Sequence, residues 1–291
     1  MSEPPPDSPR ADDGVAFVLG GGGHLGAHEV GMLRALLERE IVPALVVGTS
    51  IGAINGAVVA SDPSLETVDR LAGVWTEIAA DEAFDGSLLG RIGTLARTRT
   101  HLHENDGLRR LVRAAIPVDR FEDLKVPFQC VAASIERAAE HWFSSGPIVE
   151  AVLASAAVPG ILPPVEVDGE LFVDGGIVNS IPVSRAVALG ARTIYVLHVG
   201  RLDRPLEPPR WPWEVAAVAF EIARRHRFLG DLAGLPDGID VHVLPTGQAE
   251  APNPSDVRQH LKYRDTRRIT ERIETAHRAS AAYLRKAEAS A

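Results

Sequence analysis

One serine of the chain has the surroundings of an activated nucleophile. Ser50 lies between Gly48 and Gly52 in a Gly-x-Ser-x-Gly sequence, which follows an apolar, valine-rich run and precedes a run of small residues. Strand, sharp turn and helix in this order form a nucleophile elbow, in which a side chain at either glycine would collide with the neighbouring strand or helix. The elbow would expose Ser50 at the end of its strand, beside a helix N-terminus that favours developing negative charge. A structural turn with a capping serine is the alternative interpretation.

A glycine-rich loop upstream could bind the negative charge that such a reaction develops. Gly21, Gly22 and Gly23 lie between a predicted strand and a predicted helix. Residues without side chains let backbone N–H groups point at a common anion, and the helix N-terminus assists them. Because Gly26 completes a Gly-x-Gly-x-x-Gly pattern, the loop is typical of two kinds of site, a dinucleotide pyrophosphate site and an oxyanion hole.

The next strand favours the oxyanion hole. A dinucleotide-binding fold expects an acidic residue at the end of the second strand, about 20 residues after the glycines, to hold the ribose. Here that strand, 44–47, leads into Ser50 instead. Both loops would leave neighbouring strands at the same edge of a sheet, so they are placed to face each other. We therefore expect the amides of Gly21, Gly22 and Gly23 to face the serine.

Asp174 ends a predicted strand in a turn. It follows a run that alternates around Asp168 and Gly169, a pair typical of a tight hairpin with a type I′ turn. Gly175 and Gly176 come directly after it and keep one side of the turn open. From the residues alone, a turn-forming aspartate explains this position.

Composition excludes several other classes of function. The chain has 291 residues, 45% of them hydrophobic, and a formal net charge of −9, so no global basic field draws it to nucleic acid. Its single cysteine, Cys130, excludes an internal disulfide and a cysteine zinc cluster. His24 and His28 lack the His-Glu-x-x-His pattern of a zinc site. We expect no nucleic-acid partner, no metal and, with the dinucleotide site disfavoured, no cofactor.

Two segments bear on location. Residues 1–13 are rich in proline, serine and acidic residues and lack the basic and apolar regions of a secretory signal, so we expect a disordered tail. Residues 41–61 carry no charge, but Pro43 and three glycines interrupt them. A strand and a buried helix explain this segment better than a transmembrane helix does. The expected location is the cytoplasm, where the protein could contact a membrane at its periphery.

Strands and helices alternate along the chain, which predicts an α/β fold, a three-layer α/β/α sandwich with a largely parallel central sheet. We expect residues 14–291 to form a single domain, with the motifs in a core at 15–199 and a C-terminal strand and helices at 200–291. Segment 84–111 could be a lid or a surface helix pair. The predicted strands are 15–19, 44–47, 126–135, 140–144, the hairpin 165–173, 192–199 and 239–244, and the predicted helices are 28–40, 65–80, 148–158, 184–189, 213–229 and 255–288.

Helix 213–229 is the segment that could meet a membrane. Its apolar face and its basic end are formed by Val215, Val218, Phe220 and Ile222 and by Arg224, Arg225, His226 and Arg227. With Trp211 and Trp213, the basic cluster could touch an anionic membrane surface. A cationic helix end that complements the helix dipole is the alternative interpretation.

The poly-glycine loop, the Gly-x-Ser-x-Gly sequence and the later Asp-Gly-Gly resemble, in this order, the motifs of the patatin-like phospholipases, a family of Ser-Asp dyad acyl hydrolases. The resemblance covers residues 15–199 and includes the context at 154–160. It implies the patatin-like fold, with Ser50 as nucleophile, Asp174 as base and an oxyanion hole at the three loop glycines named above. It also implies a phospholipid or another acyl ester as substrate. The glycines expected to support the motifs are Gly26, Gly48, Gly52, Gly175 and Gly176.

One residue departs from the family pattern. The family commonly has arginine or lysine just before the last glycine of the poly-glycine motif, where this chain has Leu25, preceded by His24. The backbone donors do not depend on that side chain, so we expect an enzyme that cleaves acyl esters through an acyl-enzyme on Ser50. A catalytically weak protein of the same fold, which binds a lipid or a partner, is the alternative hypothesis.

Overall fold

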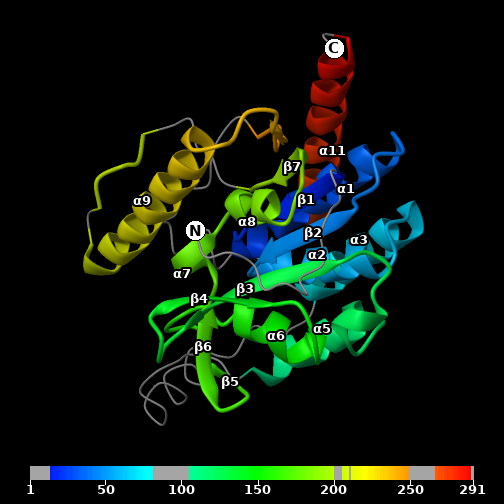
Figure 1. Ribbon diagram of the computed structural model, residues 1–291. Helices are drawn as coiled ribbons and strands as arrows, with labels where there is room; N and C mark the ends of the chain where they lie inside the picture. Colours follow the sequence, from blue (N-terminus) through cyan, green and yellow to red (C-terminus); the bar gives the residue numbers. More distant parts are fainter. Residues whose placement is uncertain (1–13, 81–104, 200–204, 210, 249–265, 290–291) are drawn as a thin grey trace.

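The central element of the fold is an eight-stranded mixed sheet with helices on both faces (Figure 1). The computed structural model describes residues 14–80, 105–199, 205–209, 211–248 and 266–289. Within these residues, the strand order is β5-β6-β3-β2-β1-β7-β8, and β4 pairs with β3 beside this path. The strands are β1 (Val15–Leu19), β2 (Leu45–Thr49), β3 (Phe128–Ser134), β4 (Ala139–Phe143), β5 (Val165–Val167), β6 (Glu170–Asp174), β7 (Thr193–Leu197) and β8 (Asp240–Val243).

One end of the sheet is a parallel block. β3, β2, β1, β7 and β8 run parallel to one another, and Leu19 at the end of β1 pairs with Gly48 near the end of β2. The glycine loop that follows β1 and the elbow that follows β2 therefore leave neighbouring strands at the same edge of the sheet, as the sequence predicted.

The other end of the sheet is antiparallel, so the sheet is less uniformly parallel than predicted. β4 and β6 both pair antiparallel with β3, and β5 pairs antiparallel with β6. The β5–β6 hairpin turns at Asp168 and Gly169, whose φ values of 52° and 80° suit the predicted type I′ turn. Asp174 then lies opposite Ala132 on β3, and β3 in turn lies beside β2, which leads to Ser50.

Two apolar cores, one on each face of the sheet, make the fold three-layered. In β1, Phe17 and Leu19 belong to one core and Ala16 and Val18 to the other, because successive strand residues point to opposite faces. This confirms the predicted α/β/α sandwich. The helices are α1 (Ala27–Leu37), α2 (Ile51–Ser61), α3 (Leu65–Ala80), α5 (Asp106–Ala115), α6 (Ile148–Ser155), α7 (Gly176–Asn179), α8 (Val183–Ala188), α9 (Pro212–Ala233) and α11 (Thr266–Glu288).

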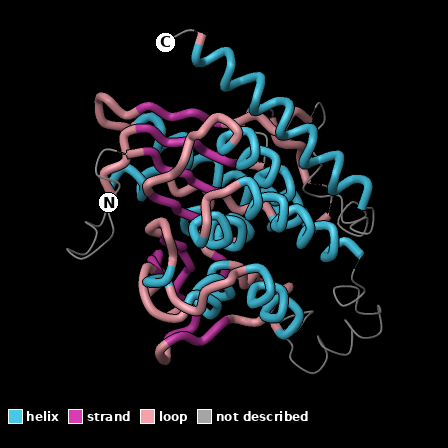
Figure 2. Tube along the Cα trace, turned by 90° about the vertical axis from the view of Figure 1, so that its right-hand side faces the viewer, coloured by secondary structure: helices cyan, strands magenta, loops and turns pink. Residues whose placement is uncertain are grey.

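Most of the helices cover the face that holds the larger core. α1, α2, α3, α5, α6 and α11 contribute side chains to this core, whereas α8 and Phe228 of α9 contribute to the smaller one. The long C-terminal helix α11 runs along the outside of the molecule (Figure 2). It packs tightly on α1, since a Cβ added at Gly31 would lie 2.1 Å from the carbonyl oxygen of Ile273.

Several predicted boundaries lie outside the described residues. These are the tail 1–13, most of the segment 84–111, and the first part of helix 255–288; α5 and α11 are the described parts of the latter two. The single domain at 14–291 stays a prediction. The uncharged segment 41–61 forms β2 and the buried helix α2, and no helix in the described residues is long and apolar enough to cross a membrane.

The prediction for helix 213–229 needs correction. α9 continues to Ala233, so the predicted basic end lies inside the helix. Glu221 forms ion pairs with both Arg224 and Arg225, and Arg227 pairs with acids of β4 and of α9 itself. Each arginine of the cluster therefore has an acidic partner, so the cluster is no free cationic end. The predicted apolar face does not pack inward either, because its three exposed members are Val215, Phe220 and Ile222.

Gly52 lies so close to β1 that it leaves no room for a side chain. An added Cβ would lie 2.4 Å from the carbonyl oxygen of Leu19. Because the obstacle is backbone, we expect Gly52→Ala to lower the free energy of unfolding by at least about 2 kcal/mol. Gly73, within α3, is the matched control: nothing lies within 4 Å of its added Cβ, so Gly73→Ala should raise that free energy by up to about 1 kcal/mol. Urea unfolding measures both variants, and equal effects would contradict the close approach.

Candidate active site

Ser50 occupies a strained turn between β2 and α2. Its φ of 56° and ψ of −123° lie in a region that residues with side chains rarely adopt. The turn is tight on both sides, since a Cβ at Gly48 would lie 2.5 Å from the carbonyl oxygen of Gly52. The Ser50 N–H donates to Ser155 Oγ at 3.0 Å, and the Ser50 residue is only 7% exposed. The local geometry is that of the predicted elbow.

Asp174, at the end of β6, faces Ser50 directly. Ser50 Oγ donates a hydrogen bond to Asp174 Oδ2 at 2.5 Å, and the N–H of Gly176 donates to Asp174 Oδ1 at 2.7 Å. The backbone N–H of Asp174 donates to the carbonyl of Ala157 at 2.9 Å. Both oxygens of the carboxylate and its backbone are therefore held, with one oxygen aimed at the serine hydroxyl.

Burial makes the Asp174 carboxylate a stronger base than an ordinary aspartate. Asp174 is 5% exposed, and loss of water raises its pKa to about 6, although the hydrogen bonds from Ser50 and Gly176 act in the opposite direction. The carboxylate is thus ionised at neutral pH and still basic enough to take a proton from a reacting hydroxyl.

The glycine loop lies against Ser50, but its amides differ in what they can bind. A Cβ added at Gly21 would lie 3.4 Å from the Cβ of Ser50, which places the loop beside the elbow. The N–H of Gly21 donates to the carbonyl of Ser180 at 2.9 Å, so this predicted donor is already engaged. Among the described residues, no acceptor is found for the N–H groups of Gly22 and Gly23. These two remain the candidate oxyanion donors.

The remaining glycines of the motifs lie at close approaches. A Cβ at Gly22 would lie 2.0 Å from Cγ2 of Val199, and one at Gly26 would lie 2.5 Å from Cγ1 of Ile51. At Gly175 it would lie 2.1 Å from the carbonyl oxygen of Val131 on β3. At Gly176 it would lie 2.9 Å from Oδ1 of the carboxylate that its own N–H binds. Each position requires glycine for space.

A buried polar network behind the site was not predicted from the sequence. Asn55 Nδ2 donates to Glu29 Oε2 at 2.7 Å and to the carbonyl of Gly26 at 3.1 Å, and Trp75 Nε1 donates to Asn55 Oδ1 at 3.1 Å. The network joins the end of the glycine loop to the elbow helix α2 and to α3. Complete burial raises the pKa of Glu29 well above its usual range. A polar residue in the otherwise apolar run of α2 was the sequence signal for it.

The hydrogen-bond partner of Ser50 Oγ is a carboxylate, and three histidines that could have completed a triad have other partners. His198, just after β7, is buried, and burial lowers its pKa well below the usual range; Arg224 Nη1 lies 3.3 Å from its ring nitrogens. His242 pairs with Asp240 at 2.9 Å. Burial lowers the pKa of His28 to about 4, and its Nδ1 donates to the carbonyl of Leu25 at 2.8 Å. These geometries favour a dyad over a triad.

The described residues contain no group of three or more histidine, cysteine, aspartate or glutamate side chains placed to hold a metal ion. The side chain of His24, the residue before Leu25, lies outside the part of the chain that the structure describes.

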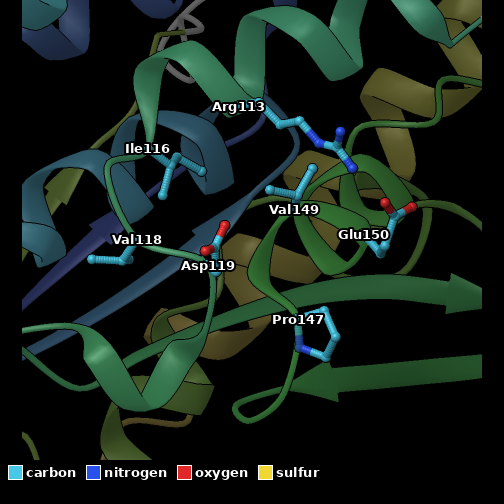
Figure 3. A pocket seen from close by; sticks show the side chains of 7 residues that line it. All are labelled: Arg113, Ile116, Val118, Asp119, Pro147, Val149 and Glu150. Atoms are coloured by element: carbon cyan, nitrogen blue, oxygen red, sulfur yellow. The ribbon is translucent and has the colours of Figure 1, made fainter.

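A cavity of about 470 Å³ lies elsewhere on the molecule (Figure 3). It is formed by residues at the N-terminal end of α6 and by α5 and the loop after it, whereas Ser155, at the C-terminal end of α6, contacts the amide of Ser50. The cavity and the Ser50 site are therefore at opposite ends of one helix. Its lining residues are Arg113, Ile116, Val118, Asp119, Pro147, Val149 and Glu150.

Comparison with known proteins points to one family. A family model described as patatin-like phospholipase matches residues 17–187. Patatin-like phospholipase domain-containing protein 7 of Rattus norvegicus is 32% identical over 191 residues, and a lysophospholipase of Mycosarcoma maydis is 31% identical over 197 residues. Each alignment covers 65% of this chain but only 14% and 10%, respectively, of the relative, so the chain spans a small part of their length.

Among solved structures, VipD from Legionella pneumophila aligns with a TM-score of 0.49 at 12% sequence identity, over 94% of this chain and 67% of that chain.

The raised pKa of Asp174 predicts a pH-dependent cost to stability. A carboxyl whose pKa is higher in the folded chain, about 6 against 3.8, stabilises the fold fully below pH 3.8, and this contribution is lost as the pH rises through 6. Asn cannot ionise, so Asp174→Asn should be more stable than wild type at pH 8, by up to about 3 kcal/mol. Thermal unfolding at pH 4.5 and pH 8 measures the difference, which should grow with pH. A difference that shrinks as the pH rises would contradict the buried, ionised carboxylate.

Proposed function

Because this chain belongs to the patatin-like phospholipase family, we propose that it is a serine lipid acyl hydrolase in which Ser50 is the nucleophile and Asp174 the base. The observation that carries the proposal is the 2.5 Å hydrogen bond from Ser50 Oγ to a buried carboxylate. A serine hydroxyl is a poor nucleophile without an adjacent base, and this contact provides one. The lysophospholipase among the relatives supports a lipid ester as the class of substrate.

The first half of the reaction forms an acyl-enzyme. Ser50 Oγ attacks the carbonyl carbon of the ester while its proton passes to Asp174 Oδ2. The carbonyl carbon becomes tetrahedral, and its oxygen becomes an oxyanion. The N–H groups of Gly22 and Gly23 would stabilise this oxyanion, each donor contributing on the order of 3 kcal/mol. Asp174 then returns the proton to the leaving alcohol, the carbon–oxygen bond of the ester breaks, and the acyl group stays on the serine.

The second half releases the acid. Water attacks the acyl-enzyme and gives a proton to Asp174, and the same oxyanion donors bind the second tetrahedral intermediate. Asp174 returns the proton to Ser50 Oγ as the carboxylic acid leaves. One carboxylate thus acts as base and then as acid in each half, which a pKa of about 6 allows near neutral pH.

Leu25 does not enter any of these steps. The donors proposed for the oxyanion are backbone groups, and their positions depend on the close approaches at Gly22 and Gly26. The substitution of a basic residue by Leu25 removes a fixed charge near the loop, which bears on the head group that the site accepts. We therefore propose turnover on esters, and the lipid-binding protein without turnover is the outcome that would contradict it.

The pH dependence of the reaction tests the proposed base. Only ionised Asp174 can accept the Ser50 proton, so kcat/KM for a soluble p-nitrophenyl ester should rise with pH through about 6 and then level off. Asp174→Asn should lower kcat/KM by about 10³-fold and remove this rise. Ser50→Ala is the control without a nucleophile.

Labelling by a fluorophosphonate accompanies these measurements. The reagent should modify wild-type protein at Ser50 and leave Ser50→Ala unmodified. If Asp174→Asn keeps most of the wild-type rate, the base is another group. If wild type is neither labelled nor active on any ester of a panel that includes phospholipids and lysophospholipids, the hydrolase proposal fails.

A further inference from the structure

The outer surface of α9 is apolar along most of its length. Val215, Ile222 and Leu229 are 53%, 54% and 54% exposed, and their spacing of seven residues places them on one face of the helix. Exposed Ala219 and His226 lie on the same face. We refer to Val215, Ala219, Ile222 and Leu229 as the apolar ridge. Among the described exposed positions of α9, His226 is the one ionisable residue.

The ion-paired side chains of α9 lie on its inner side and along its flanks. Glu221 and Arg224 are buried and form an ion pair at 2.7 Å, and Arg225 pairs with the same glutamate at 2.8 Å. Arg227 pairs with Glu140 of β4 at 3.2 Å. An amphipathic helix of a globular protein usually has one apolar stripe, which faces the core. α9 also packs apolar side chains into the smaller core, so the ridge is a second apolar face, which is exposed. An exposed apolar face of this length indicates a partner.

One flank of α9 lies beside the Ser50–Asp174 site. A Cβ added at Gly176, whose N–H binds the Asp174 carboxylate, would lie 3.1 Å from Cζ of Phe220. Arg227 Nη1 donates to the carbonyl of Val178 in α7 at 3.4 Å. Figure 1 shows α9 at the edge of the molecule, next to α7 and α8. A surface that the ridge contacts would therefore lie within one helix diameter, about 10 Å, of α7 and the proposed site.

Shape and charge identify the partner. The ridge is the outer face of a single helix, about 33 Å long for its 22 residues, and among the described residues of that helix His226 is the one exposed group that could make an ionic contact with a protein partner. Trp211, at its N-terminal end, is 56% exposed, as expected of an aromatic residue at a lipid–water interface. The net charge of −9 disfavours an anionic surface. We propose that the apolar ridge docks on a neutral, zwitterionic lipid surface and so brings the Ser50–Asp174 site to its substrate.

That docking gives the site access to its substrate rests on the proposed function, whereas docking alone does not. Docking is tested with the full chain carrying Ser50→Ala, by flotation with phosphatidylcholine vesicles. This protein should float with the vesicles, and adding Ile222→Glu or Leu229→Glu should lower the bound fraction about tenfold. Val42→Glu is the matched control, because Val42 is 48% exposed and precedes β2, at the sheet edge opposite Ser50. It should leave flotation unchanged.

Turnover separates the two proposals. In chains with Ser50 intact, Ile222→Glu and Leu229→Glu should hydrolyse a soluble short-chain ester at the wild-type rate, which also shows that they fold, and should lose about tenfold on phosphatidylcholine vesicles. Ridge-dependent flotation without any turnover would contradict the proposed function alone.

Three results would overturn the docking proposal. In the first, the parent Ser50→Ala chain does not float with phosphatidylcholine vesicles. In the second, the ridge variants float as well as the parent. In the third, sedimentation velocity shows a dimer that Ile222→Glu dissociates, which would assign the ridge to a second copy of this chain.

Discussion

The hydrogen bond between Ser50 and Asp174 joins two segments 124 residues apart, and the arrangement of the sheet makes it feasible. Ser50 follows β2 and Asp174 ends β6, and β3 lies between these strands and pairs with both. In the observed register, Thr49 lies opposite Val131 and Asp174 opposite Ala132, so both chain ends reach the same part of the sheet edge. This requires β6 to run antiparallel to β3, so the antiparallel end of the sheet serves to bring Asp174 to the edge where Ser50 lies.

The same contact is maintained at a cost to stability. A serine with φ of 56° is strained, and a carboxylate is kept from water. Neighbouring groups stabilise both. Ser155 Oγ accepts from the Ser50 N–H, Gly176 donates to the carboxylate, and Glu29 and Asn55 tie the glycine loop to the elbow helix. The strain is therefore fixed by contacts from α6, α7 and α1 rather than relieved by local movement.

The parts of the fold that sequence predicts well are those governed by local rules. The glycines around Ser50 predicted the elbow because only they fit the turn, and Asp168-Gly169 predicted the hairpin because both positions need positive φ. Neighbouring parallel strands then placed the glycine loop beside Ser50. The role of Asp174, in contrast, came from resemblance to a family, since an aspartate before two glycines is also a common turn.

Contacts between distant segments could not be predicted from the sequence. The engagement of the Gly21 N–H by Ser180 depends on how the segment before α8 packs under the loop, and no spacing encodes it. The Glu29–Asn55–Trp75 network joins three helices, so it appears only when they pack. For α9, the periodicity showed an apolar face correctly, but not which face turns outward. That depends on contacts with other elements, such as the packing of Phe228 in the smaller core and the ion pair of Arg227 with Glu140 of β4.

The most direct measurement of the central claim is the site of acyl transfer. Intact-mass and peptide mass spectrometry of the protein quenched in acid during turnover of an acyl p-nitrophenyl ester would locate the acyl group. The mechanism predicts an acyl group on the peptide that contains Ser50, on the serine oxygen, and a much lower yield of this adduct in Asp174→Asn. An acyl group on another residue, or steady turnover by Ser50→Ala, would contradict it.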